Sequence, residues 1–161
     1  MKYCPLCGAD LVKGIVEERE RLHCSQNGCD YIFWDNPLSV IAGIVEYQKS
    51  IILAHNVEWP DGVYSVITGF LEKGETPEEG IIREVKEELG LSCEITDFIG
   101  VYSFHEMNQL ILAYHIKAEG NICLNEELTD IKMIEKTKLK GWSFGTGLAV
   151  NDWIKKQKQN D

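Results

Sequence analysis

The apolar positions of the chain form short runs that are typical of strands, and longer segments with helical spacing. Residues 38–47 and 51–56 are apolar runs separated by a short break, and they predict two paired strands. Residues 92–104 and 109–120 are two further strand candidates, while residues 145–159 are apolar at helical spacing with a basic end. The pattern predicts a mixed sheet covered by helices, in an α/β or α+β domain.

A second helix is predicted between the two pairs of strands, in the segment "ETPEEGIIREVKEELGL" (75–91). Thr76 is a suitable N-cap, Pro77 occupies the first helical position, and Gly90 ends the helix. Two glutamates in the first turn favour the same start, because the helix N-terminus attracts negative charge. The start and stop signals therefore agree.

This helix brings three carboxylates together on one face. With about 100° between successive residues, Glu87 lies about 60° to one side of Glu84 and Glu88 about 40° to the other. The apolar stripe that can pack on the sheet is separate and consists of Ile81, Ile82, Val85 and Leu89. Because like charges at such spacings repel, the carboxylate face requires an explanation.

Two interpretations of this face are open, and the simpler one is a solvated acidic surface. Against it, no lysine lies on the face, and Arg83 borders it where a guanidinium can hold a carboxylate by two hydrogen bonds. The preceding glycine-rich loop "GFLEKGE" adds Glu72 and Glu75. Clustered oxygen ligands with room for water suit Mg²⁺ or Mn²⁺. We therefore expect a divalent metal site here.

The first 29 residues contain four cysteines in the pattern C-x2-C, sixteen residues, C-x4-C: Cys4, Cys7, Cys24 and Cys29. This is close to the four-cysteine zinc pattern, and Gly8 and Gly28 allow the chain to turn around a tetrahedral ion. Four cysteine ligands leave no open position, so we expect a structural Zn²⁺. Two disulfides are the competing interpretation, and His23 is an alternative ligand.

Length and charge limit the remaining possibilities. The 161 residues are 44% hydrophobic, enough for one domain of ordinary size and a small appendage. The character of the sequence changes near Pro37, so we expect a zinc ribbon at residues 1–36 and the larger domain at residues 37–161. No apolar run approaches the roughly 20 residues of a membrane-spanning helix, and no secretory signal is recognisable. We expect a cytoplasmic protein without a membrane partner, and the net charge of −10 argues against DNA binding.

The segment from Gly69 to Leu91 resembles a complete Nudix box: Gly69, five residues, Glu75, seven residues, then "REVKEELGL". A four-cysteine ribbon before such a domain is similar to the NADH pyrophosphatase subgroup and to the plant FAD pyrophosphatases of the family. The resemblance implies an α/β/α sandwich that cleaves a nucleoside diphosphate linked to another group, such as FAD, NADH or ADP-ribose. It implies a small nucleotide substrate, release of AMP and a second phosphorylated product, and is compatible with a homodimer.

The resemblance also implies roles for particular residues. Glu84, Glu87 and Glu88 would bind Mg²⁺ with the Gly69 carbonyl, while Arg83 orients Glu84 and Glu75 supports the loop. The segment "EELTDIKM" (126–133) resembles a late family segment that supplies a further ligand or base, which indicates Glu127, with Glu126 as the competing choice. We hypothesise that Glu84 or Glu127 is the general base.

The substrate is less well indicated. The NADH pyrophosphatase subgroup has a signature of the form SQPWPFPxS, whereas this chain has "YSFHEMNQL" (102–110), so it is more similar to FAD-cleaving and ADP-ribose-type members. Tyr102, Phe104 and His105 are candidates to line a base-stacking pocket, although strand aromatics are more often part of a core. Two other functions remain open: a regulator that binds a nucleotide without cleaving it, and a zinc-ribbon docking protein on a Nudix scaffold.

Overall fold

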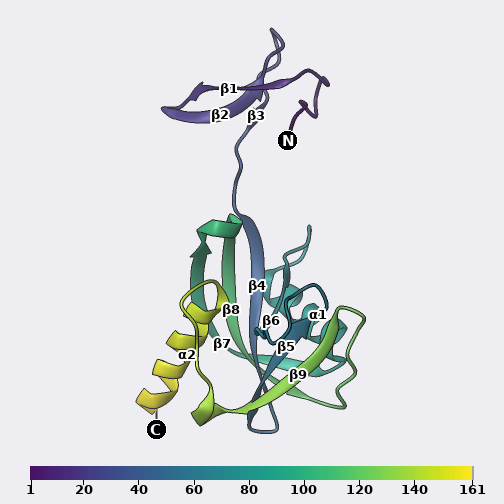
Figure 1. Cartoon of the computed structure of the whole chain (residues 1–161), viewed down its shortest axis with the longest axis vertical. Coiled ribbons are helices and arrows are strands. Elements are labelled where there is room, and N and C mark those ends of the chain that lie inside the picture. Colours follow the sequence, from purple (N-terminus) through teal and green to yellow (C-terminus); the bar gives the residue numbers. More distant parts are fainter. Residues whose placement is uncertain (161) are drawn as a thin grey trace. The chain divides into compact units, whose positions relative to one another are not determined.

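The computed structural model describes residues 1–160, and the chain divides into two compact units, of which the first is Met1–Asn36 and the second begins at Pro37. The first unit is a three-stranded antiparallel sheet of β1 (Leu11–Val16), β2 (Arg19–Cys24) and β3 (Ile32–Phe33) (Figure 1). Cys4 and Cys24 are its only buried residues, so this unit has no apolar core.

The second unit is built on a six-stranded mixed sheet. Its strands are β4 (Leu38–Tyr47), β5 (Ser50–Asn56), β6 (Ile67–Phe70), β7 (Ser92–Phe104), β8 (Gln109–Glu119) and β9 (Leu128–Glu135). The order is β7-β8-β4-β5-β9, and β6 also pairs with β4. β4 runs parallel to β8 along one edge, while its other edge pairs with β6 and then with β5. This pairing makes β4 the centre of the sheet.

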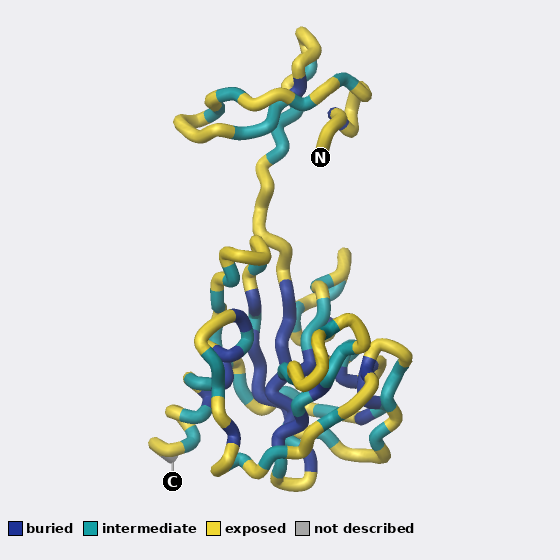
Figure 2. The backbone as a smooth tube through the Cα atoms, viewed as in Figure 1, coloured by how far each residue is buried: buried dark blue, intermediate teal, exposed yellow. Residues whose placement is uncertain are grey.

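Two helices complete an α/β/α sandwich: α1 (Pro77–Leu89) and α2 (Thr146–Asn160) (Figure 1). Side chains of β4 alternate between two buried clusters, since Ile41 and Val45 pack with α1, whereas Ala42 and Ile44 pack on the side of α2. A strand buried on both faces reads as a continuous apolar run. Figure 2 shows the resulting concentration of buried residues along the central strands.

The predicted fold class is confirmed, and so are the expected strands at 38–47, 51–56, 92–104 and 109–120, with small shifts at their ends. Patterning did not identify β6 because the strand has only four residues beside the glycine-rich loop. Two short 3₁₀ helices, His105–Met107 and Lys136–Lys138, were also not predicted. Within residues 1–160 neither α-helix is long and apolar enough to cross a lipid bilayer.

Candidate active site

The start of α1 has the caps that its sequence predicts. The Thr76 side chain accepts a hydrogen bond from the Glu79 backbone N–H, and the Glu79 carboxylate accepts one from the Thr76 N–H. At the other end, Gly90 adopts the left-handed conformation with φ 70°. The two ends fix the helix between loop residues 71–76 and β7, so its polar face is placed directly beside the end of β6.

Arg83 organises the acidic residues around it. Its Nε and Nη2 donate to the two Glu75 oxygens at 3.0 and 2.8 Å, and Nη1 donates to Glu84 Oε1 at 2.7 Å and Glu87 Oε2 at 3.1 Å. Nη2 also donates to the Phe70 carbonyl at 3.3 Å. The hydrogen bonds from Arg83 lower the pKa of Glu75 to about 2. The two parallel hydrogen bonds from Arg83 to Glu75 are the strong form of a charge-assisted hydrogen bond, and they hold the loop that carries Glu75 against α1.

Two glycines make room for these carboxylates. A Cβ added at Gly69 would lie 1.9 Å from Glu84 Oε1, so the Glu84 side chain occupies the space that any other residue at this position would fill. A Cβ at Gly80 would meet Glu75 Oε1 at 2.8 Å and the Ile41 side chain at 2.7 Å. At both positions a neighbouring side chain lies so close to the backbone that only glycine fits without a shift.

Glu88 has an environment opposite to that of Glu75. The residue is only 6% exposed, and within residues 1–160 no hydrogen bond or ion pair to its carboxylate is found. Burial raises the pKa of Glu88 to about 8, and the charges of Glu84, Glu127 and Glu87 add to this effect. Burial also raises the pKa of Glu84, against the opposing effect of Arg83. A buried carboxylate surrounded by carboxylates lacks a positive partner, which a bound cation would supply.

Glu127 reaches this face from a distant part of the chain. Its backbone carbonyl accepts a hydrogen bond from Val57 N–H at 2.8 Å, and the Asn125 N–H donates to the Glu88 carbonyl at 3.3 Å. The segment before β9 is thereby held against the C-terminal end of α1. The Glu127 side chain is exposed, and its charge raises the pKa of both Glu84 and Glu88, so Glu127 lies near the carboxylate face.

The four cysteines of the first unit form a second cluster. Their sulfur atoms all lie within 4.8 Å of one another, with Cys7 and Cys24 Sγ 3.4 Å apart and Cys4 and Cys29 Sγ 3.8 Å apart. A tetrahedral Zn²⁺ with bonds of about 2.3 Å requires sulfurs about 3.8 Å apart, so the arrangement fits this ion. His23 is outside the cluster: its Nδ1 contacts the Cys24 carbonyl at 3.1 Å, and its ring packs over Gly14.

In the second unit, aromatic side chains lie on the α2 side of the sheet, opposite to the side that α1 and its carboxylates cover. Phe70 and Phe144 are more than half exposed, and the rings of Phe104 and Phe144 have centroids 6.1 Å apart. Of the three aromatic candidates from the sequence, Tyr102 is tied to α2 by a hydrogen bond to Asp152, Phe104 is half-buried and His105 is exposed. Sequence reasoning missed Phe70 and Phe144, although the position of Phe70 directly after Gly69 was a usable signal.

Comparison with known proteins identifies a family that matches this chain. The NUDIX domain model matches residues 36–145. The NAD-capped RNA hydrolase NudC of Pseudomonas aeruginosa is 28% identical over 128 residues, which cover 78% of this chain and 44% of that protein. The chain spans about half the length of the curated relatives it matches.

Solved structures show the same fold. A NUDIX hydrolase from Nitrosomonas europaea matches with a TM-score of 0.82 and 22% identity, covering 99% of this chain and 92% of that one. An ADP-ribose pyrophosphatase from Streptococcus suis matches with a TM-score of 0.63 and 16% identity, covering 76% and 93% of the two chains. Because the matched domain includes more than half of the chain and the whole carboxylate face, the protein belongs to the Nudix domain family.

Proposed function

We propose that the protein is a divalent-metal-dependent pyrophosphohydrolase. It cleaves the diphosphate linkage of a nucleoside diphosphate joined to a second group, of the FAD, NADH or ADP-ribose type, and releases AMP and a second phosphorylated product. The observation that carries this proposal is Glu88, a carboxylate that is 6% exposed and whose pKa is raised by burial and by the charges of Glu84, Glu127 and Glu87. Such a group is stable in its charged form when a cation is bound beside it.

The residues that would hold the metal are Glu84, Glu87 and Glu88, with the Gly69 carbonyl and Glu127. All are oxygen donors, and the exposed side chains of Glu87 and Glu127 leave room for water, as Mg²⁺ or Mn²⁺ requires. When bound, the cation neutralises charge on the diphosphate and lowers the pKa of a coordinated water. The set therefore fits a magnesium site that acts on phosphate.

The other residues of the site act on this carboxylate set. Arg83 occupies Oε1 of Glu84 with a 2.7 Å hydrogen bond and so directs Oε2 of the same group away from the guanidinium. Glu75 anchors Arg83 through both oxygens and receives the Glu72 N–H at 2.8 Å, which fixes the loop that carries Gly69. Glu84 or Glu127 would accept the proton of the attacking water as general base.

The exposed rings of Phe70 and Phe144 support a substrate with a flat ring. Phe70 adjoins the carboxylate face, because its backbone carbonyl accepts a hydrogen bond from Arg83. Exposed aromatic rings offer stacking surfaces for a nucleobase. The names of the relatives refer to a NAD-derived linkage and to ADP-ribose, both of which contain an adenosine diphosphate unit.

The cysteine cluster completes the proposal with a structural Zn²⁺. Since all four ligands are thiolates, this ion would have no position for substrate. Its contribution is to the folding of residues 1–36, which contain no apolar core.

The decisive measurement is Mg²⁺-dependent AMP release by the full chain from FAD, NADH, NAD⁺ and ADP-ribose. We expect turnover of at least one substrate, and a loss of about 10³-fold in kcat for Glu88→Gln, since a bound ion supplies several kcal/mol of charge stabilisation that a weakened site would lose. Glu94→Gln is the matched control, because Glu94 is an exposed carboxylate on β7 that belongs to neither metal cluster. Tight nucleotide binding without any AMP release would contradict hydrolysis and favour the regulatory alternative.

A further inference from the structure

The carboxylate face is bordered by two loops that are joined to each other. Residues 57–66 connect β5 to β6, and residues 120–127 connect β8 to β9. The Val57 N–H donates to the Glu127 carbonyl at 2.8 Å, and the charge of Glu127 acts on both Glu84 and Glu88. The two loops therefore form a rim next to the proposed metal ligands.

This rim carries negative charge and contains no Lys or Arg of its own. Glu58, Asp61 and Glu126 are exposed, whereas residues 57–66 and 120–131 contain no Lys or Arg. The nearest following cation in sequence is Lys132, whose Nζ lies 3.7 Å from the centroid of the Tyr64 ring. On the helix side, Arg83 is bound by three carboxylates. Lys73 is the exposed cation in the loop before α1.

The surrounding unit has the same balance of charge. Residues 37–161 contain twelve Lys and Arg against twenty Asp and Glu, and residues 1–36 contain four against six. Several of the cations are already paired with carboxylates: Arg83, Lys136, Lys138, Lys155 and Lys156. Both parts of the chain are therefore acidic by count, whereas proteins that bind a nucleic-acid backbone usually carry an excess of Lys and Arg.

We propose that this acidic rim selects free, low-molecular-weight nucleoside diphosphate derivatives and disfavours the same linkage at the 5′ end of an RNA chain. The inference rests on the proposed function and narrows its substrate class. A free dinucleotide brings only its diphosphate, which the metal neutralises. An RNA chain adds one negative charge per nucleotide, and those phosphates would lie within the Debye length, about 8 Å at physiological salt, of uncompensated carboxylates.

The test compares kcat/KM of the full chain for free NAD⁺, NADH and FAD with that for an RNA oligonucleotide carrying a 5′ NAD⁺ cap. At about 50 mM salt we expect the capped RNA to be cleaved at least about tenfold less efficiently than the best free substrate. Raising the salt to about 300 mM should narrow the ratio, because screening weakens the repulsion. A basic RNA-binding enzyme would show the opposite slope, losing RNA cleavage as salt increases.

The variant Glu58→Lys/Asp61→Lys tests whether the rim causes the lower kcat/KM for capped RNA. It should raise kcat/KM for capped RNA about fivefold to tenfold at low salt and leave the free substrates within about twofold. Neither side chain belongs to the proposed metal site, and both are exposed.

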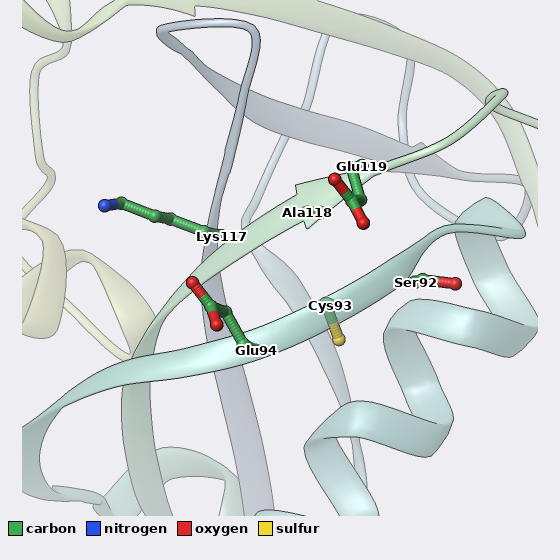
Figure 3. Close-up of a pocket in the computed structure, with 6 residues that line it drawn as sticks. All are labelled: Ser92, Cys93, Glu94, Lys117, Ala118 and Glu119. Carbon is green, nitrogen blue, oxygen red and sulfur yellow. The ribbon is translucent and has the colours of Figure 1, made fainter.

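The matched control is Glu94→Lys/Glu119→Lys, which changes the net charge by the same amount on β7 and β8, away from the loop that carries Glu58 and Asp61. Glu94 and Glu119 line an open pocket of about 450 Å³ at the far end of β7 and β8 (Figure 3). In the sheet, Glu94 and Glu46 both lie opposite Lys117, and Gly69 lies opposite Ile41. Glu46 is roughly 17 Å along β4 from Ile41, so Glu94 is far from the Gly69 end of the carboxylate face. The control should leave the ratio between the substrates nearly unchanged.

Equal or better cleavage of capped RNA at low salt would overturn the inference while leaving the proposed hydrolysis intact. An equal gain from the control variant would also overturn it, because it would show an effect of net charge rather than of the rim. Failure to cleave any free substrate would instead remove the proposed function on which the inference rests.

Discussion

The two proposed clusters of metal ligands differ in what surrounds them. The cysteine cluster lies in a unit whose only buried residues are Cys4 and Cys24. The carboxylate cluster lies on a helix whose other face buries Ile81, Val85 and Leu89 completely against the sheet. In the first case the metal would take the place of a hydrophobic core, and in the second it would be added to a core that is already complete.

This contrast explains the difference in ligand chemistry. Thiolates that close a tetrahedron bind Zn²⁺ so tightly that the ion becomes part of the fold. Carboxylates that repel each other without the ion, with Glu87 and Glu127 exposed to solvent, would bind and release Mg²⁺ together with substrate. On the proposed function, short-spaced ligands and glycines would therefore form a structural site in one unit and a reactive site in the other.

The largest expected effect separates the two units. Cys4→Ser should unfold residues 1–36, because structural zinc contributes about 10–16 kcal/mol to the folding of such small units. The measurement is an NMR amide spectrum, in which the dispersed signals of β1–β3 should collapse while those of β4–β9 persist. Cys123→Ser, at an exposed thiol outside the cluster, is the control. Persistence of the β1–β3 signals in the zinc-free variant would show that this unit is stable without metal.

A smaller effect concerns the stability of the metal-free carboxylate site. In the folded protein the pKa of Glu88 is raised to about 8 from 4.5, so between these values the folded state retains a proton that the unfolded chain has lost. Stability without metal should therefore fall as pH rises through this range. Glu88→Gln removes the dependence, so in EDTA the variant should match the parent near about pH 5 and exceed it by a few kcal/mol near about pH 9.

Denaturant unfolding of both proteins at several pH values measures this difference, and added Mg²⁺ should restore the stability of the parent alone. A variant that is less stable than the parent at high pH would mean that the charged Glu88 has a favourable partner.

The smallest effect is a change of geometry within the site. Gly69→Ala places a methyl group 1.9 Å from the present position of Glu84 Oε1, so that side chain must move away from β6. We expect kcat to fall by about tenfold or more, as a misplacement of about 1 Å can cost a catalytic site 10²-fold. The melting temperature should change little, because Glu84 is at the edge of the core. Unchanged kcat would argue against a role for the close approach of Gly69 and Glu84.

The sequence contained most of the local information about α1. Thr76, Pro77 and Gly90 define the helix ends through interactions within a few residues, and the helical period alone places Glu84, Glu87 and Glu88 on one face. The strand β4 could be predicted equally well from the sequence, since a long apolar run between turns is a strong signal.

Features that depend on contacts between distant parts of the chain were harder to predict from the sequence. The burial of Glu88 depends on tertiary contacts that helical periodicity does not predict. One of these is with the segment before β9, where the Asn125 N–H donates to the Glu88 carbonyl. The position of Glu127 depends on its contact with Val57, which lies 70 residues earlier in the chain. The resemblance to a known family indicated Glu127, with Glu126 as the competing choice, and a loop glutamate without a role was an equally good interpretation of the residues. Phe144 is brought to Phe104 by the docking of α2, a tertiary event without a local signature.

The parallel pairing of β4 with β8 has a consequence for how the protein folds. These strands are neighbours in the sheet, yet they are separated in the chain by β5, β6, α1 and β7. Non-local pairing of this kind slows folding, because a long loop must close before its contacts form. We expect refolding in milliseconds to seconds, with α1 and its carboxylates able to form early through local contacts and Glu127 joining them only when β9 completes the sheet. Catalytic competence would then be one of the last properties that a refolding chain acquires.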